Sequence, residues 1–336
     1  MLGDLFCHRV KFKKIMWKNL RKIDIVNNSI KRVRIGNTYL RNFLLQRRLT
    51  FPKVVQVEST NACNLECIMC PHKSMTRKIG NMDFDLFKMV VDQCSNERIE
   101  VLVLNKDGEP LLHPRISEMV AYAKAKNIPW VSMDSNAYFL TADVATALIE
   151  AKLDEINITV DGATKRTYEK IRVNSNFERV VENIIGLMNL KKRLGSRNPM
   201  VIVKILKMRE TISEIQSFLK YWKPIVDRVC VEPVNAWAGQ VEYTGVDSLT
   251  KVRRYPCPQL WELLPINWNG EAVMCCVDIN GVQKLGDIKQ ESIKSIWRGE
   301  KLENIRRMHL NGDFSNIPLC SSCTYWYFCN KPFYWW

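Results

Sequence analysis

Six short apolar runs that alternate with helix-like segments constrain the fold of this 336-residue chain more than any other feature. The apolar runs have the length of β-strands and lie at residues 53–58, 99–104, 129–134, 155–161, 200–207 and 228–232. Helical patterns occupy the intervals near residues 83–95, 114–126, 141–151, 176–193 and 211–222. Such alternation specifies βαβ units and a parallel sheet. We therefore expect an α/β protein built on a partial (β/α)6 TIM-like barrel, whose ligands bind at the carboxyl ends of the strands.

Three cysteines follow the first predicted strand within eight residues, at Cys63, Cys67 and Cys70. Thiolates favour iron–sulfur clusters, zinc or copper(I), so the loop is suited to a soft metal centre. A cubane iron–sulfur cluster takes four ligands, and a loop with only three cysteines leaves one iron open to a ligand that is not protein. The alternative is a zinc site in which His72 is the fourth ligand.

Polar turns follow the next three predicted strands. The sequence Asn-Lys-Asp-Gly-Glu-Pro occupies residues 105–110, Asp134 is followed by Ser135 and Asn136, and residues 159–162 read Thr-Val-Asp-Gly. Because the carboxyl ends of parallel strands meet at one edge of a sheet, we expect these turns to lie beside the cysteine loop.

The cysteine spacing, together with Gly108, Glu109 and Pro110, resembles the radical S-adenosylmethionine (SAM) superfamily. The resemblance implies that the open iron binds SAM, that an electron cleaves the sulfonium, and that a 5'-deoxyadenosyl radical abstracts hydrogen from the substrate. It also implies SAM contacts, which we expect at Met69, Gly108, Glu109, Pro110, Ser135, Asn136, Asp161 and Arg172. Two positions depart from the family pattern: Asp107 replaces the first glycine of the Gly-Gly-Glu-Pro motif, and Met69 replaces a common aromatic residue.

Beyond residue 235 the alternation stops and cysteines return. Apolar segments on either side of Asn269 and Gly270 predict a β-hairpin, and a helix is expected around residues 292–308. The order of the cysteines resembles the auxiliary-cluster extensions of radical SAM enzymes that are called SPASM and twitch domains. The resemblance implies one auxiliary [4Fe–4S] cluster bound by Cys257, Cys275, Cys320 and Cys323, with Cys329 as a substitute ligand. Zinc in the same four thiols is the alternative.

The charge of the chain is concentrated in its first fifty residues. Of the net charge of +15, residues 1–50 contribute +11, from thirteen Lys or Arg against two Asp. Two short amphipathic helices are expected there, which either meet a membrane surface or an acidic partner, or pack on the barrel. We expect a basic N-terminal arm at 1–50, a radical SAM barrel at 51–235 and an auxiliary-cluster domain at 236–336.

Twelve cysteines without a recognisable signal peptide indicate a reducing, cytoplasmic location. No apolar run is long enough to span a bilayer, so membrane contact is expected only at the periphery, through residues 1–50. Basic residues confined to that arm indicate only non-specific electrostatic attraction to nucleic acid, and no specific nucleic-acid partner is expected.

The resemblance implies an oxidoreductase that dehydrogenates or epimerises a carbinol carbon of a sugar or aminocyclitol, supplied with electrons by a donor such as flavodoxin or ferredoxin. In an epimerase a free thiol returns a hydrogen atom to the substrate, and Cys329 is the candidate for this catalytic role. One alternative is a maturase that modifies a ribosomally made peptide. The non-enzymatic alternative is an iron–sulfur or zinc protein that binds nucleic acid through its basic arm.

Overall fold

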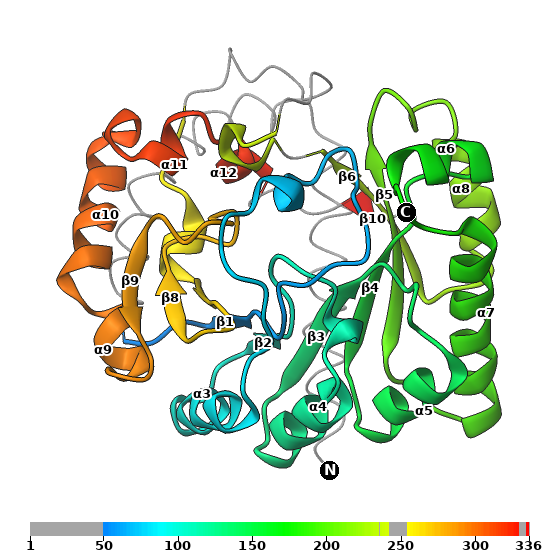
Figure 1. Cartoon of the computed structure of the whole chain (residues 1–336), viewed down its shortest axis with the longest axis horizontal. Coiled ribbons are helices and arrows are strands. Elements are labelled where there is room, and N and C mark those ends of the chain that lie inside the picture. Colours follow the sequence, from blue (N-terminus) through cyan, green and yellow to red (C-terminus); the bar gives the residue numbers. More distant parts are fainter. Residues whose placement is uncertain (1–49, 235, 242–253, 329–333, 336) are drawn as a thin grey trace, which may run out of the picture. The chain divides into compact units, whose positions relative to one another are not determined.

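Ten strands of the computed structural model form one sheet in the order β10-β6-β5-β4-β3-β2-β1-β7-β8-β9 (Figure 1). The structure describes residues 50–234, 236–241, 254–328 and 334–335. Six successive parallel strands make up the barrel: β1 (Val54–Val57), β2 (Val101–Val103), β3 (Trp130–Ser135), β4 (Glu155–Thr159), β5 (Met200–Lys207) and β6 (Arg228–Pro233). The predicted partial (β/α)6 barrel is confirmed.

Helices follow the strands and lie along the outside of the sheet in Figure 1. They are α3 (Phe84–Glu97), α4 (Ile116–Ala125), α5 (Ala142–Glu150), α6 (Lys165–Ile171), α7 (Phe177–Leu194) and α8 (Ile215–Trp222). Side-chain caps begin several of them: Asp83 accepts from the amides of Asp85 and Leu86, and Asn176 accepts from the amide of Arg179. The sequence did not predict α6, which has seven residues and buries only Tyr168 and Ile171.

Short 3-10 helices occupy several connecting segments, among them the loops after β1, β2 and β6. They are η1 (Pro71–Ser74), η2 (Pro110–Leu112), η3 (Trp237–Gly239), η4 (Pro258–Trp261) and η5 (Phe314–Asn316). Three of these begin with proline, whose fixed φ and missing N–H suit the first helical position.

The predicted C-terminal hairpin is confirmed, and it extends the barrel sheet. Strand β7 (Leu263–Ile266) pairs antiparallel with β8 (Glu271–Val273), and Gly270 supplies the turn with a φ of +91°. The other edge of β7 pairs in parallel with β1, and β9 (Lys284–Asp287) pairs with β8. The C-terminal region is therefore hydrogen-bonded to the strand that precedes the cysteine loop. At the far edge of the sheet, β10 (Tyr334–Trp335) pairs with β6.

The prediction of a single helix at residues 292–308 is wrong in detail, because the structure has two helices there. They are α9 (Ile293–Trp297) and α10 (Glu300–Asn311), and Gly299 separates them with an extended backbone at φ −67° and ψ 153°. The chain continues into α11 (Pro318–Ser321) and α12 (Tyr325–Phe328).

Several predictions concern residues outside the described ranges. These include the amphipathic helices of residues 1–50 and the catalytic or substitute-ligand role of Cys329. The boundaries near residues 50 and 235 also stay predictions. Among the helices that the structure describes, none combines the length and apolarity needed to cross a membrane.

Candidate active site

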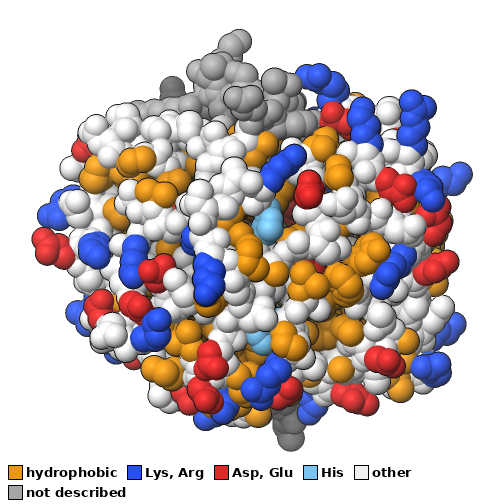
Figure 2. Space-filling view, in the orientation of Figure 1, with side chains coloured by type: hydrophobic (Ala, Val, Ile, Leu, Met, Phe, Trp, Pro, Cys, Tyr) orange, Lys and Arg blue, Asp and Glu red, His pale blue; other side chains and the backbone are white. Residues whose placement is uncertain are grey.

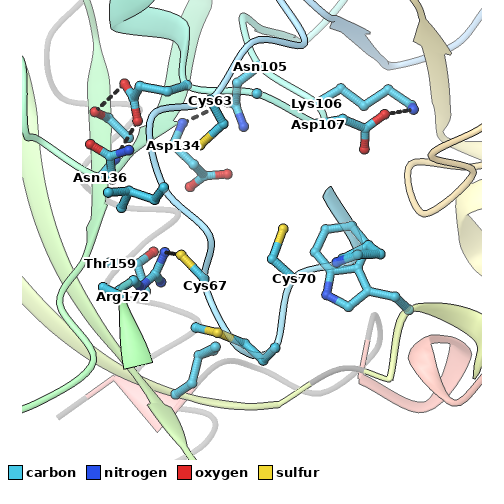
Figure 3. Close-up of a pocket in the computed structure, with 18 of the residues that line it drawn as sticks. Cys63, Cys67, Cys70, Asn105, Lys106, Asp107, Asp134, Asn136, Thr159 and Arg172 are labelled. Carbon is cyan, nitrogen blue, oxygen red and sulfur yellow. Dashed lines mark hydrogen bonds and ion pairs between the residues drawn. The ribbon is translucent and has the colours of Figure 1, made fainter. Parts of the chain in front are cut away.

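A cavity of about 280 Å³ lies at the carboxyl ends of the barrel strands (Figure 3). Its wall includes the cysteine loop, the turns after β2 and β3, side chains of β4, β5 and β6, and two residues from the C-terminal part, Trp237 and Ile279. In the view of Figure 2, acidic and basic side chains are mixed over the described surface, without one basic patch. The cavity wall, by contrast, brings together three thiols and several charged side chains.

The thiols of Cys63, Cys67 and Cys70 border the same space in Figure 3. Backbone hydrogen bonds fix the loop, since the Cys70 amide donates to the Cys67 carbonyl at 3.0 Å and the Ile68 amide donates to the Ile171 carbonyl at 3.0 Å. Met69 is 5% exposed and belongs to an apolar cluster at the base of the loop. This packing holds the three thiols toward one cavity.

His72, which would be the fourth ligand of a zinc site, is hydrogen-bonded to the backbone. Within the described ranges, no three His, Cys, Asp or Glu side chains lie close enough together to hold one ion. His72 Nε2 instead donates to the Asn61 carbonyl at 2.7 Å, so this nitrogen is engaged. Burial raises the pKa of Cys63 to about 12 and that of Cys70 to about 11, and a bound metal must therefore displace their protons.

Gly108 lies where the turn after β2 touches the backbone that precedes Cys63. A Cβ at this position would lie 2.5 Å from the Ala62 carbonyl oxygen and 2.6 Å from that of Thr60. The neighbouring amide, of Glu109, donates to the Ala62 carbonyl at 2.8 Å. Only glycine permits this close approach of two backbone segments at the cavity wall.

The carboxylate of Glu109 ties the turn after β2 to the end of β3. It accepts from the Leu111 amide at 3.0 Å, the Ser135 hydroxyl at 2.8 Å and the Asn136 amide at 2.7 Å. The Asn136 side chain in turn donates to Asn64 Oδ1 at 2.9 Å, within the cysteine loop. Burial raises the pKa of Glu109 to about 7. Glu109 thus organises three turns of the wall.

Arg172 connects a buried carboxylate to one of the three thiols. Its Nη2 and Nε donate to Asp161 Oδ2 at 2.6 and 2.9 Å, and its Nη1 donates to Cys67 Sγ at 3.4 Å (Figure 3). The other oxygen of Asp161 accepts from the Leu206 amide at 2.8 Å. Asp161 therefore aims the guanidinium at the sulfur of Cys67.

A second charged network joins the cavity to the C-terminal part of the chain. Arg77 donates to both oxygens of Glu58, at 2.8 and 2.6 Å, and to Asp107 Oδ2 at 2.9 Å. It also donates to the Ile279 carbonyl at 2.6 Å, while Lys106 pairs with Asp107 and donates to the Asp278 carbonyl at 2.9 Å. The turn after β2 is thus fastened to the segment that follows Cys275.

Six of the predicted SAM contacts line the cavity: Met69, Gly108, Glu109, Ser135, Asn136 and Arg172. Two do not line it, because Pro110 begins η2 and Asp161 lies behind Arg172 with no exposed surface. Sequence reasoning did not name the other twelve wall residues as site residues, and the charged ones among them are Lys106, Asp107, Asp134, Lys204 and Glu232. Charged residues near the ends of apolar strands were the signal that could have identified Lys204 and Glu232.

Four cysteines of the C-terminal part surround a second, smaller cavity. Cys257, Cys275, Cys320 and Cys323 all line it, and so do His309 and Arg254. Cys276 is half-buried and is not among the lining residues. Burial raises the pKa of Cys320 to about 12 and that of Cys323 to about 11. Four thiols around one space are a donor set that suits a fully ligated iron–sulfur cluster, and also the zinc ion of the alternative.

The sequence matches two family descriptions. A model described as the radical SAM superfamily matches residues 57–221, and one described as the SPASM iron–sulfur cluster-binding domain matches residues 257–324. The tungsten-containing aldehyde ferredoxin oxidoreductase cofactor-modifying protein of Pyrococcus furiosus is 23% identical over 315 residues, which cover 81% of this chain and 87% of that protein. The mycofactocin maturase MftC of Mycobacterium tuberculosis is 32% identical over 143 residues, which cover 42% of this chain but only 36% of MftC.

Solved structures share the fold. BtrN in complex with AdoMet and 2-DOIA has a TM-score of 0.57 at 18% identity, and the match covers 81% of this chain and 93% of BtrN. SuiB of Streptococcus suis, bound to the precursor peptide SuiA, has a TM-score of 0.65 at 11% identity, over 78% of this chain and 69% of SuiB. At these identities the likeness shows the fold alone.

Proposed function

The chain belongs to the radical SAM superfamily and carries a C-terminal SPASM domain, and from that premise we propose that it oxidises or epimerises a carbinol carbon of a sugar or an aminocyclitol. Its cofactors are SAM and [4Fe–4S] clusters. We assign the SAM cluster to Cys63, Cys67 and Cys70. The auxiliary cluster is assigned to Cys257, Cys275, Cys320 and Cys323.

When bound, these groups supply a 5'-deoxyadenosyl radical, which removes a hydrogen atom from the substrate, and a second site that exchanges an electron. The residues of the chain hold and orient them. Arg172 donates to the sulfur of Cys67, and Glu109 fixes the turn at Ser135 and Asn136. The Met69 side chain packs in the apolar cluster that supports the cysteine loop. Trp237 and Ile279, from the C-terminal part of the chain, complete the cavity wall.

The observation that carries the proposal is the set of four cysteines around the second cavity. Four thiolates complete the ligation of one cubane, which leaves no open iron for substrate. Electron transfer is then the role that we assign to this site. Loss of a hydrogen atom and then of an electron and a proton converts a carbinol carbon to a ketone.

Hydrogen bonds at the second cavity favour the acceptance of an electron. The Cys257 amide donates to His309 Nδ1 at 3.3 Å, so this nitrogen is unprotonated. The other ring nitrogen then carries the proton of the neutral imidazole, and it donates to Cys320 Sγ at 3.3 Å. The Tyr325 amide donates to Cys323 Sγ at 3.3 Å, and the Arg254 guanidinium donates to the Cys320 carbonyl at 2.6 Å. Donors at the sulfurs, and positive charge close to them, stabilise the more negative, reduced cluster.

Substitution of His309 tests this assignment. In a protein that lacks Cys63, Cys67 and Cys70, His309→Phe is expected to lower the midpoint potential of the remaining cluster, because the N–H donor to Cys320 is lost. Electron paramagnetic resonance during a redox titration measures the potential. His113→Phe is the matched control, since His113 is also buried but donates to the Met82 carbonyl in the barrel. An unchanged potential, or the loss of the cluster's iron, would refute the tuning role.

Gly108→Ala tests the backbone contact at the cofactor site. A Cβ there would overlap two carbonyl oxygens, so we expect a loss of stability of about 1–3 kcal/mol and weaker SAM binding. Urea unfolding and equilibrium dialysis with SAM measure the two effects. Gly186→Ala is the control, because an added Cβ at that helical position meets nothing within 4 Å. If Gly108→Ala behaves like Gly186→Ala, the close approach is unimportant.

A substrate screen tests the reaction itself. The anaerobically reconstituted protein, supplied with SAM and dithionite, is expected to release 5'-deoxyadenosine faster when a suitable aminocyclitol or sugar is present. Mass spectrometry should detect a product that has lost two hydrogen atoms, or an isomer with one solvent hydrogen in the case of epimerisation. If no sugar or cyclitol accelerates SAM cleavage, the proposal for the substrate class is wrong.

Peptide modification is the second candidate, favoured by the partial match to the maturase MftC. The fold does not decide between the two classes, because it is shared with BtrN and with SuiB. A small peptide that accelerates SAM cleavage in the same screen, where cyclitols do not, would establish this alternative.

A further inference from the structure

Three charged side chains of the cavity form a cluster that the radical chemistry does not explain. Lys204 Nζ lies 3.3 Å from Asp134 Oδ1 and 3.2 Å from Glu232 Oε1. The three residues come from β5, β3 and β6, near the carboxyl ends of the strands, and all three line the cavity. We refer to Asp134, Lys204 and Glu232 as the carboxylate–lysine cluster.

The cluster lies partly away from the proposed SAM contacts. The cysteine loop and the turn at Gly108 follow β1 and β2, whereas Lys204 and Glu232 belong to β5 and β6, at the other end of the barrel strand order. Thr159 is the register partner of Lys204 on β4 and also lines the cavity. Asp134 directly precedes the proposed SAM contact Ser135, whereas Lys204 and Glu232 lie on strands that carry none of the proposed SAM contacts.

The cluster carries one more negative than positive charge. Burial alone would lower the pKa of Lys204, but the charges of Asp134 and Glu232 outweigh it and raise the pKa, so the ammonium stays charged. Lys204 is therefore not a proton acceptor at neutral pH. Within the ranges that the structure describes, Lys204 is the ion-pair partner of both carboxylates, and the second oxygen of each carboxylate makes no hydrogen bond to protein.

The exposure of the three side chains is suited to ligand binding. The side chains of Lys204 and Glu232 are 18% and 21% exposed, and that of Asp134 is 49% exposed. The carboxylates are thus partly desolvated but still reached from the cavity. At such positions an ammonium group gains a charge-assisted hydrogen bond, while a phosphate or carboxylate meets repulsion.

We propose that Asp134 and Glu232 bind a cationic amino group of the substrate, which is an amino-substituted polyol. This inference rests on the proposed function. Lys204 holds the two carboxylates apart in fixed positions and donates to a neighbouring hydroxyl. A neutral sugar would leave the excess negative charge unmatched, and a nucleotide sugar would bring phosphates against two carboxylates. The cluster therefore selects within the class of carbinol substrates.

Isothermal titration calorimetry on the reconstituted, SAM-bound full chain tests this selection without any turnover. Three cyclitol probes are compared: scyllo-inosamine, scyllo-inositol and myo-inositol 1-phosphate, which carry an ammonium, no charge and a phosphate. The amine is expected to bind at least about tenfold more tightly than the other two. Glu232→Gln and Asp134→Asn, which keep the shape but remove a charge, should each weaken amine binding by about tenfold or more. Glu182→Gln, which removes an exposed carboxylate from α7, should leave it unchanged.

SAM affinity and iron content serve as the second readout on the same variants, and both are expected to stay at wild-type values. Weaker SAM binding in Glu232→Gln would overturn the inference, because the carboxylates would then serve the cofactor. It is also overturned if scyllo-inosamine fails to bind, or if the neutral or phosphorylated cyclitol binds as tightly. Amine binding without any ketone or epimer as product would instead leave this inference standing and contradict the proposed reaction.

Discussion

Replacement of Cys63, Cys67 and Cys70 together by alanine is expected to abolish the dithionite-dependent release of 5'-deoxyadenosine. The same change should lower the iron content from about eight to about four atoms per chain, because one of two cubanes loses its ligands. The three thiols border one cavity. His72, the other side chain of this loop that could bind a metal, is hydrogen-bonded to the Asn61 carbonyl. Iron analysis and chromatography of the reaction products measure the two effects.

Cys94→Ala is the matched control for the triple variant. Cys94 is fully buried in α3 and packs in the core, away from the cavity wall. Its loss should leave both iron content and SAM cleavage intact. Full iron content in the triple variant would show that the first cluster is not held by these cysteines.

Arg172→Met is expected to lower the free energy of unfolding by about 3–5 kcal/mol, which is the effect of leaving one charge of a buried ion pair without its partner. The Asp161 side chain has no exposed surface, and both of its side-chain ion-pair contacts come from Arg172. The variant also loses the donor to Cys67 Sγ. Urea unfolding of the wild type and the variant measures the difference.

Two further variants distinguish the effect of losing the ion pair from the effect of losing arginine side-chain volume. Arg193→Met removes an exposed arginine in the last turn of α7 and should change stability by less than about 0.5 kcal/mol. The double variant Asp161→Asn, Arg172→Met should lose less than the sum of the single changes, because no buried charge is then stranded. If Arg172→Met is as stable as Arg193→Met, the ion pair does not support the site.

The barrel strands could be predicted because each is a short apolar run bounded by polar turns. Residues 200–207 were predicted with the same bounds as β5, and the other five barrel strands were found within a few residues. The cysteine loop and the turn at Gly108 were predicted to meet because both follow neighbouring parallel strands, and both line the cavity. These predictions rest on local pattern and on the direction of the strands.

The pairings that depend on side-chain reach could not be predicted. Nothing in the spacing of Asp134, Lys204 and Glu232 indicates that they meet, because they lie on three different strands, β3, β5 and β6, and β4 lies between the first two. The parallel pairing of β7 with β1 was likewise missed, since the hairpin pattern fixes β7 against β8 but leaves its other edge undetermined. Pro110 and Asp161 were assigned to SAM from their motifs, whereas the structure places them behind the residues that line the cavity.

The most direct test of the account is to ask whether the wild-type chain cleaves SAM. Purified protein, loaded with iron and sulfide under anaerobic conditions and reduced with dithionite, is incubated with SAM, and the products are separated by chromatography. The account predicts methionine and 5'-deoxyadenosine in equal amounts, formed only when reductant is present. Intact SAM after incubation of fully iron-loaded, reduced protein would contradict it.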